Sequence, residues 1–271
     1  FSADGFHMKA LLVDAGNTRI KWTVVTAGRL APPRATPWSD TQPLSAWLAR
    51  AGDFERVVAC SVAGPGAERT LRRLLRAAGA PAPEFIHSSA QAAGVRNGYR
   101  EPKRLGDDRW VGAVSAWHLA GCFRAVCAVS VGTALTIDVV DCDGVHRGGL
   151  IAPGPTLMLQ SLLRDTAGIA PRAAASAASR RSRADSTGTL GLLATDTRQA
   201  IELGCLSAAA ALVDRTVTDV TRRMRGRPVV FLTGGGADAV APLLRSACKQ
   251  RDELVLRGLA ILAGIPVRRR G

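Results

Sequence analysis

Two stretches of this chain share one layout: a strand, a turn of glycine and small polar residues, and a second strand. The first is residues 11–25, an apolar run followed by the turn Asp14-Ala15-Gly16-Asn17-Thr18 and an alternating run. The second is residues 129–140, with Gly132-Thr133 where Gly16-Asn17 fall in the first. One such hairpin is typical of an ordinary turn. Two copies about half a chain apart favour related half-domains that face one cleft, where backbone N–H groups beside glycine can approach phosphates.

Composition restricts the classes of protein to which the chain can belong. A chain of 271 residues with 47% apolar and 21% charged residues is globular, with one large or two ordinary domains. The net charge of +14 invites a nucleic-acid interpretation, but only four of the basic residues are lysine and aromatic residues make up 4%. No basic block alternates with aromatic residues as a base-stacking surface does, so we do not expect a nucleic-acid partner. A basic surface suits anionic substrates such as a nucleotide triphosphate.

Cysteine and hydropathy patterns predict a cytoplasmic protein. The six cysteines show no C-x-x-C pair and no zinc-type spacing with the four histidines, which favours reduced thiols. His87 has no partner at metal-ligand spacing and is interpreted as structural. No run of about 18 apolar residues predicts a membrane span. Residues 1–7 lack the features of a signal peptide, and we interpret Met8 as the natural start after an expression remnant.

Along the chain, strands and helices alternate as in α/β proteins. Residues 29–42 contain several Pro breakers and are expected to form a loop, and residues 63–66 are expected to form a turn. The Gly/Pro-rich segment 146–155 is also expected to be a loop and is interpreted as lining a ligand. Residues 170–188 are rich in Ala, Ser and Arg and are expected to be a flexible excursion. The predicted helices are 44–51, 68–78 with Gly79 after its end, 110–120, 156–164, about 197–223 with Asp196 or Thr195 as its cap, 240–244 and 254–263; further strands are predicted at 56–62, 84–87 and 227–233.

Asp107-Asp108 precedes the predicted helix at residue 110 and allows two interpretations. Carboxylates at a helix start cap free N–H groups and suit the helix dipole. Alternatively, one caps while the other projects into the cleft as a general base, with Arg109 holding an anion. Spacing alone does not separate the two. Near the end of the chain, a buried strand runs into Gly234-Gly235-Gly236, where a base or ribose could lie against backbone.

Together these segments resemble the type III pantothenate kinases of the acetate/sugar kinase and actin-like superfamily. The resemblance spans roughly residues 11–264 and is missing mainly in the excursion. Seven motifs occur in the family's order: Asp14-Ala15-Gly16-Asn17-Thr18; Asn97-Gly98-Tyr99; Gly106-Asp107-Asp108-Arg109-Trp110; Gly132-Thr133-Ala134; Gly148-Gly149 with Pro153-Gly154 and Leu157-Met158; Thr197 with Ala200-Ile201 and Gly204; and Thr233-Gly234-Gly235. Each motif is weak alone, and the ordered set makes an accidental match improbable.

The resemblance implies ATP-dependent phosphorylation of pantothenate to 4′-phosphopantothenate, the first step of coenzyme A biosynthesis. It implies an α/β fold of two ribonuclease H-like (actin-like ATPase) domains around a central cleft. We place the first domain at 8–117, with the first phosphate loop and the substrate motif, and the second at 118–267, with the second phosphate loop and the adenosine segment. It also implies a homodimer that helps to form the substrate pocket, Mg²⁺ with ATP, and a monovalent cation, K⁺ or NH₄⁺.

Residue by residue, the resemblance implies three sets of site residues. Asp108 would be the base that takes the proton from the pantothenate hydroxyl, and Asp14 would lie near the metal–phosphate group. The ATP-binding residues would be Asp14, Ala15, Gly16, Asn17, Thr18, Arg19, Ile20, Lys21 and Thr133. The pantothenate-binding residues would be Tyr99, Gly106, Asp107, Asp108, Arg109 and Thr197, with Arg109 suited to the substrate carboxylate. These residue types fit phosphoryl transfer, which needs mainly positioning and charge neutralisation, and the missing Walker A lysine excludes the P-loop class.

One residue departs from the family pattern. Members usually carry Asp two residues before the second loop's glycine, where it is associated with the monovalent cation, and here that residue is Ser130. A hydroxyl supplies a neutral ligand in place of a charged one. The sequence therefore predicts a weaker or altered dependence on K⁺ or NH₄⁺.

Two rival functions are weighed against this one. The first is an enzyme of the same fold with another acceptor, a different hydroxyl substrate or a phosphate chain; Tyr99 and Asp108-Arg109, the substrate-side motifs, argue against it. The second is a non-catalytic regulator that binds nucleotide or nucleic acid through its positive surface. That rival predicts binding with a steep salt dependence and no turnover, and the intact phosphate loops and candidate base argue against it.

Overall fold

The computed structural model describes residues 8–166, 168–179, 193–224 and 226–268. These residues form two compact units. The first contains the described residues up to Ala128, together with Asp138–Gly148 and the described residues from Arg251 onward; the second contains Val129–Ile137 and the described part of Gly149–Gln250. The interpretation of residues 1–7 falls outside the described residues. The domain limits 8–117 and 118–267 remain a prediction.

The first unit is built on a six-stranded sheet in the order β3-β2-β1-β5-β6, with β4 also paired to β2. Strands β1 and β2 form the predicted first hairpin, and β5 lies parallel to β1 on its other side. The prediction of a loop at 29–42 is wrong in part, because β3 and β4 lie in this segment, and both pair with β2 and extend the sheet. The strands are β1 Lys9–Ala15, β2 Arg19–Thr26, β3 Arg29–Leu30, β4 Arg34–Pro37, β5 Arg56–Ser61 and β6 Glu84–Phe85.

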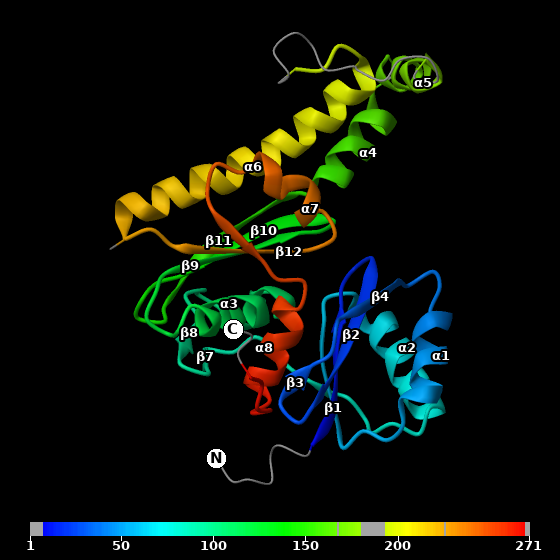
Figure 1. Ribbon diagram of the computed structural model, residues 1–271, viewed down its shortest axis with the longest axis vertical. Helices are drawn as coiled ribbons and strands as arrows, with labels where there is room; N and C mark the ends of the chain where they lie inside the picture. The colour runs from blue at the N-terminus through cyan, green and yellow to red at the C-terminus, as the bar shows by residue number, and fades with distance from the viewer. Residues whose placement is uncertain (1–7, 167, 180–192, 225, 269–271) are drawn as a thin grey trace. The chain divides into compact units, whose positions relative to one another are not determined.

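Alternation along β1 divides its side chains between two cores. Leu11 and Val13 pack with residues of α1 (Gln42–Ala51) and α2 (Gly64–Ala77) on one face of the sheet. Ala10 and Leu12 pack with Val111 of α3 and with α8 (Leu254–Leu262) on the other. Figure 1 shows this arrangement, with α1 and α2 on one side of β1 and α8 on the other.

The ends of α2 and α3 show how well local signals locate helices. Gly79, with φ of 70°, follows the last turn of α2 as predicted. The prediction of a turn at 63–66 is wrong, because α2 already begins at Gly64. Pro65 is tolerated in its first turn, since the N–H groups there have no partner within the helix. Helix α3 (Asp107–Leu119) begins with the acidic pair, and two short strands, β7 (Gln91–Ala92) and β8 (Val95–Arg96), and the 3₁₀ turn Pro102–Arg104 lead into it.

A second sheet has the order β11-β10-β9-β12-β13. Strands β9 and β10 form the predicted second hairpin, whose residues are divided between the two units, as are those of β11. The prediction of a loop at the Gly/Pro-rich segment 146–155 is wrong, because His146–Pro153 forms strand β11, which pairs with β10. The remaining strands are β9 Val126–Val131, β10 Ala134–Val140, β12 Val229–Thr233 and β13 Cys248–Gln250, of which β13 is not anticipated.

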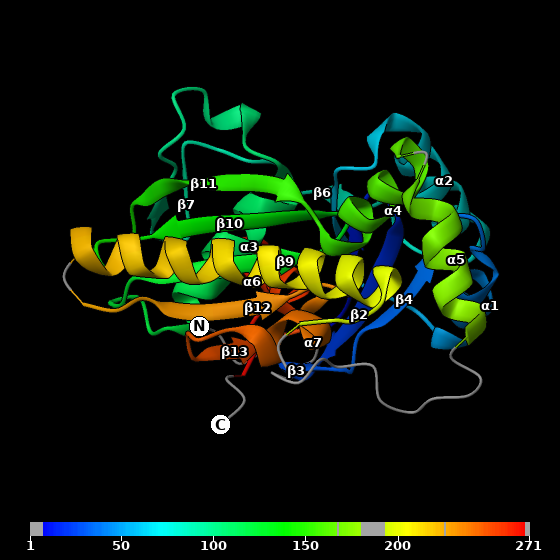
Figure 2. The same ribbon diagram turned by 90° about the horizontal axis from the view of Figure 1, so that it is seen from above.

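Helices of the second unit include α6, which runs from Thr197 to Arg223 as predicted. Asp196 caps it by accepting a hydrogen bond from the Gln199 N–H at 3.0 Å. Figure 2 shows α6 lying along strands β9, β10 and β12. The other helices are α4 Pro155–Asp165, α5 Ile169–Ser179, α7 Ala237–Val240 and the 3₁₀ turn Ala241–Leu243.

Helix α5 corrects the expectation of a flexible excursion at 170–188 over its first ten residues, because alanine-rich sequence favours helix. The rest of that segment falls outside the described residues, as does most of the predicted ragged end at 268–270. All six cysteines are free thiols. In the part of the chain that the structure describes, every helix is too short or too polar to cross a membrane.

Candidate active site

Asp14 lies near the end of β1, between two neighbouring strands. Its register partners are Lys21 on β2 and Cys60 on β5, and the Cys60 thiol donates to the Asp14 carboxylate at 3.8 Å. Burial raises the pKa of Asp14 to about 6; Lys21 opposes the shift and the Asp108 carboxylate adds to it. The loop tip at Asn17, Thr18 and Arg19 is exposed, and the Trp38 indole N–H donates to the Gly16 carbonyl at 2.7 Å. The first loop therefore joins an anchored backbone to one half-buried carboxylate.

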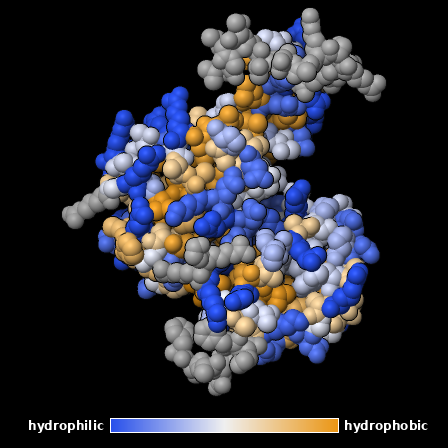
Figure 3. Space-filling model, viewed as in Figure 1, coloured by the Kyte–Doolittle hydropathy of each residue, from blue (hydrophilic) through white to orange (hydrophobic). Residues whose placement is uncertain are grey.

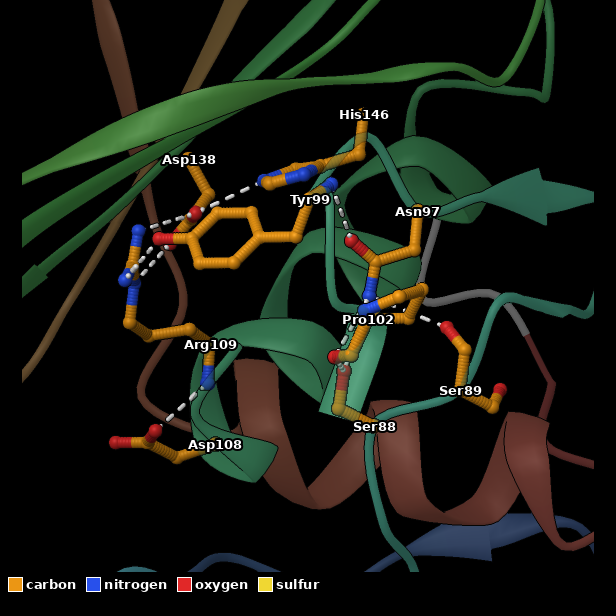
Figure 4. Close-up of polar contacts among 9 residues, drawn as sticks. All are labelled: Ser88, Ser89, Asn97, Tyr99, Pro102, Asp108, Arg109, Asp138 and His146. Carbon is orange, nitrogen blue, oxygen red and sulfur yellow. Dashed lines mark hydrogen bonds and ion pairs between the residues drawn. The ribbon is translucent and has the colours of Figure 1, made fainter. Parts of the chain in front are cut away.

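The N-terminus of α3 carries two carboxylates with different partners. Asp107 accepts from the Ser88 N–H at 2.7 Å and contacts the His87 Nδ1 at 2.9 Å, so it ties the segment after β6 to the helix. His87 was interpreted as structural, and the contact to Asp107 is one that the sequence did not indicate. Asp108 accepts from the Arg109 N–H at 2.8 Å. Because one Asp108 oxygen accepts this bond and the other points away from the helix in Figure 4, capping and a role as base are compatible in Asp108.

Electrostatics also favour Asp108 as a base. Burial raises the pKa of Asp108, the Arg109 N–H and guanidinium oppose the rise, and Asp138 and Asp107 add to it. Asp14 and Asp108 are also close enough to interact electrostatically, since the Asp108 charge raises the pKa of Asp14. The predicted metal-side carboxylate and the predicted base thus lie in the same unit and influence each other's charge.

Arg109 is held in a buried ion pair that the sequence analysis did not predict. Its Nε donates to Asp138 Oδ2 at 2.9 Å and its Nη2 to Asp138 Oδ1 at 2.7 Å, with the two side chains 7% and 3% exposed. Its Nη1 donates to the Tyr99 hydroxyl at 2.9 Å. The His146 Nε2 contacts Asp138 Oδ1 at 2.9 Å, and the Tyr99 and His146 rings lie 5.8 Å apart. Figure 4 shows this group of four side chains, which come from the Tyr99 loop, α3, β10 and β11 and all belong to the first unit.

Asp138 had a sequence signal that was not used. It is the only charged residue in strand β10, whose other residues are apolar except for Thr136, and a buried charge in a strand is rare unless it is paired. His146 begins β11 and had no comparable signal, because its partner is set by tertiary structure. Both residues belong to the first unit with Arg109 and Tyr99.

Asn97 organises the loop that carries Tyr99. Its amide nitrogen contacts the Ser88 hydroxyl and the Ser89 carbonyl, each at 3.1 Å, and the Pro102 carbonyl at 3.3 Å. Its oxygen accepts from the Tyr99 N–H at 3.0 Å. Next to it, a β-carbon at Gly98 would overlap the carbonyl oxygen of His146, so only glycine fits there. The sequence motif Asn97-Gly98-Tyr99 therefore has a structural reason for each residue, and Figure 4 shows the contacts of Asn97 and Tyr99.

The second loop, Gly132-Thr133, lies in the second unit, and Thr133 is exposed. Other glycine segments pack directly on its backbone: the Gly154 N–H donates to the Thr133 carbonyl at 2.8 Å, and the Gly236 N–H donates to the Val131 carbonyl at 2.9 Å. Gly234 has φ of 100°, and a β-carbon there would overlap the Val131 carbonyl. Three motifs that are far apart in sequence thus meet at one loop. Thr197, at the first turn of α6, belongs to the same unit, and Ser130 is half-buried on β9.

Solved structures share this fold at low sequence identity. A putative 2-dehydro-3-deoxygalactonokinase from Sinorhizobium meliloti is 16% identical with a TM-score of 0.51, covering 94% of this chain and 98% of that one. The ethanolamine utilization protein EutJ from Carboxydothermus hydrogenoformans is 14% identical with a TM-score of 0.51, covering 94% and 89%. A putative Baf family transcriptional activator from Campylobacter jejuni is 17% identical with a TM-score of 0.56, covering 94% and 98%. The chain therefore has the ribonuclease H-like fold of the actin-like ATPase class, as predicted.

Sequence relatives define the family within that class. A sequence model of the type III pantothenate kinases matches residues 10–219. A type III pantothenate kinase from Nitrosococcus oceani is 39% identical over 259 residues, covering 93% of each chain, and one from Burkholderia mallei is 35% identical over 263 residues, covering 93% and 98%. The chain belongs to the type III pantothenate kinase family, which confirms the resemblance drawn from the seven motifs.

Proposed function

We propose that this chain acts as its family name states: it phosphorylates pantothenate with ATP, giving 4′-phosphopantothenate and ADP, the first step of coenzyme A biosynthesis. The observation that carries the proposal is Asp108. It is a half-buried carboxylate with a raised pKa and one outward oxygen at the start of α3, directly beside the Arg109–Tyr99 group.

In the proposed reaction, Asp108 takes the proton from the pantothenate hydroxyl. The hydroxyl oxygen then forms a bond to the γ-phosphorus of ATP, the bond from that phosphorus to the β–γ bridging oxygen breaks, and ADP leaves. A carboxylate with a raised pKa is the stronger base, which suits this proton transfer. The remaining groups act by positioning the reactants and neutralising charge.

The ATP side of the proposal rests on the two loops. Residues Asp14 to Lys21 and Thr133 bind ATP phosphates, the first loop through backbone N–H groups and Lys21. Asp14 suits Mg²⁺, which prefers oxygen ligands and keeps phosphate oxygens and water around it, so a single protein carboxylate is enough. The Ser130 hydroxyl is one neutral ligand, so K⁺ or NH₄⁺ binds weakly or not at all beside the second loop.

The substrate side of the proposal uses the start of α3 and the Tyr99 loop. Arg109 and Tyr99 bind pantothenate, with the guanidinium directed to the carboxylate, and Thr197 is a further substrate contact. Gly106 and Asp107 act mainly by placing the helix start, because both Asp107 oxygens already accept or contact groups of residues 87–88.

We further propose a homodimer in the cytoplasm, with domains at 8–117 and 118–267. Four large apolar side chains of β11 and α4 are 37% to 65% exposed, namely Leu150, Ile151, Leu157 and Leu162. Figure 3 shows apolar residues gathered over α4 among hydrophilic ones. An apolar patch of this kind is typical of a surface that a second subunit covers.

The proposal is tested by a coupled assay of ADP release with pantothenate as acceptor. We expect Asp108→Asn to lower kcat about 10²- to 10⁴-fold, because the amide is no base. Asp219→Asn, which removes a partly buried carboxylate paired with Arg215 on α6, is the control and should keep the wild-type rate. ADP release that does not depend on pantothenate, or an Asp108→Asn variant as fast as wild type, overturns the assignment.

A further inference from the structure

Arg109 retains hydrogen-bonding capacity although it is buried. A guanidinium has five N–H groups. Two are used by Asp138 and one by the Tyr99 hydroxyl, which leaves one on Nη1 and one on Nη2 among the contacts of the described residues. The side-on pair with Asp138 fixes the guanidinium plane, so the direction of the two remaining groups is fixed as well.

Asp138 is held just as firmly. Its Oδ1 contacts both Arg109 Nη2 and His146 Nε2, and its Oδ2 accepts from Arg109 Nε. His146 is fully buried, and its Nδ1 has no hydrogen-bond partner within the described residues. Among those residues, the polar contact of this imidazole is therefore the one to Asp138.

We infer that Asp138 and His146 are positioning residues that fix Arg109 for an anionic carboxylate, and so set the preference for a carboxylate substrate over a neutral analogue. The inference rests on the proposed function only in taking pantothenate as the ligand. Neither residue touches the substrate in this account. Their action goes through the plane and the fixed position of one guanidinium.

A competing account makes the opposite prediction. Asp138 carries a negative charge next to Arg109, and on charge alone it would repel a substrate carboxylate and occupy its donors. In that case, removing the Asp138 charge would tighten pantothenate binding. If Asp138 positions Arg109, the same change loosens binding, because an unpaired buried guanidinium is free to turn toward other partners.

The test compares two ligands that differ at one group. Pantothenyl alcohol has a neutral hydroxymethyl group where pantothenate has its carboxylate. We expect calorimetric titration of wild type to give tighter binding of pantothenate, and Asp138→Asn to reduce the ratio of the two dissociation constants at least about tenfold. The affinity for pantothenyl alcohol and for an ATP analogue should change less than about threefold, because neither contains that carboxylate.

A matched control comes from the same hairpin. Asp141 follows the end of β10 and accepts from the Asp143 and Val145 N–H groups and from Arg147, whose side chain is 54% exposed. Asp141→Asn removes an equal charge from an ion pair that does not involve Arg109. It should leave the ratio of dissociation constants unchanged even where it lowers stability.

A second pair of variants covers the case in which Asp138→Asn does not fold. His146→Leu fills the buried site but removes the contact to Asp138, and it should lower the ratio about three- to tenfold. His146→Gln keeps an N–H donor and should restore much of the ratio. A merely structural role predicts that both variants change stability and leave the ratio alone.

The outcomes separate the inference from the proposed function. An unchanged ratio in both Asp138→Asn and His146→Leu, or tighter pantothenate binding by Asp138→Asn, overturns the inference. Failure of wild type to bind pantothenate, or to prefer it over the alcohol, overturns it too. Wild type that binds pantothenate with the expected preference but releases no ADP contradicts the proposed function, while the ratios still decide the role of Asp138.

Discussion

The two loops that share one layout in sequence differ in what holds them. The first, after Asp14, has a half-buried carboxylate facing Lys21 and Cys60, and a β-carbon on its glycine would meet only one carbonyl, at 3.3 Å. The second, at Gly132-Thr133, has Ser130 in place of a carboxylate. Its backbone is enclosed by Gly154, Gly234 and Gly236, which are brought in from other segments.

The difference shows two ways of making an anion-binding loop. The first loop relies on a titratable side chain whose charge state depends on its surroundings. The second relies on backbone shape that only glycine neighbours permit. Substitutions in the first loop should therefore lower activity with little loss of stability. Substitutions in the second loop should mainly lower the stability of the fold.

The largest effect is expected from Asp14→Asn on the use of Mg–ATP. The change removes the only carboxylate of the first loop and should lower kcat/KM for Mg–ATP about 10²-fold or more, because charge stabilisation at the phosphates is lost. Pantothenate affinity in calorimetric titrations should stay within about twofold of wild type. Equal losses for both ligands would contradict a role confined to the metal and phosphates.

Gly234→Ala should have the next largest effect, on stability. The β-carbon would overlap the Val131 carbonyl at a φ of 100°, and we expect the free energy of unfolding to fall by about 3 kcal/mol. The matched change in the first loop is Gly16→Ala, where the nearest atom is the Arg19 carbonyl oxygen at 3.3 Å. For that variant, the free energy of unfolding measured in urea should fall by less than about 1 kcal/mol, while the activity with ATP is lost. Similar losses of stability would remove the distinction between the loops.

Asp14 also predicts a pH-dependent difference in stability. Its native pKa of about 6 lies above the unfolded value of 3.8, so the native state binds the proton more tightly and ionisation destabilises the fold as pH rises from about 4 to 6. Asparagine remains neutral. Asp14→Asn should therefore be more stable than wild type by up to about 3 kcal/mol at pH 8, and the two should converge near pH 3. Denaturant unfolding at both pH values measures this; a variant that is less stable at pH 8 would show that the carboxylate stabilises the fold.

The smallest effect is expected at Ser130. Wild-type activity should change less than about twofold on adding K⁺, since a hydroxyl is a weak ligand, and Ser130→Asp should give a saturable stimulation of about two- to fivefold. Activity measured across K⁺ concentrations with Na⁺ as the ionic-strength control decides it. A strong, saturable K⁺ requirement in wild type would show that the missing carboxylate does not matter.

Local patterns predicted those parts of the fold that local forces determine. Both hairpins, a helix start within three residues of Asp107 and a cap at Asp196 or Thr195 were predicted because turn chemistry and capping act within a few residues. Strand β11 was missed because Gly148-Gly149 weakens strand propensity, and only pairing with β10 settles that segment. Helix α5 was missed because low-complexity composition outweighed the helix preference of alanine.

Sequence motifs named single residues of the candidate site but not the pairs that they form. Arg109 and Tyr99 stand in such motifs, whereas the pairing of Arg109 with Asp138 spans 29 residues and depends on how β10 passes α3. Nothing in the spacing links them. His146 is further removed, since it acts on Arg109 only through Asp138.

The Asn97 amide has a thermodynamic consequence for ligand recognition. The Asn97 side chain makes four polar contacts, three through its amide nitrogen and one in which its oxygen accepts from the Tyr99 N–H. Together with the close approach of Gly98 to His146, these contacts restrict the segment from Ser88 to Pro102 when the protein folds. Tyr99 is therefore already ordered before any ligand arrives. Little entropy is then lost by the protein on this side of the site when a small ligand binds.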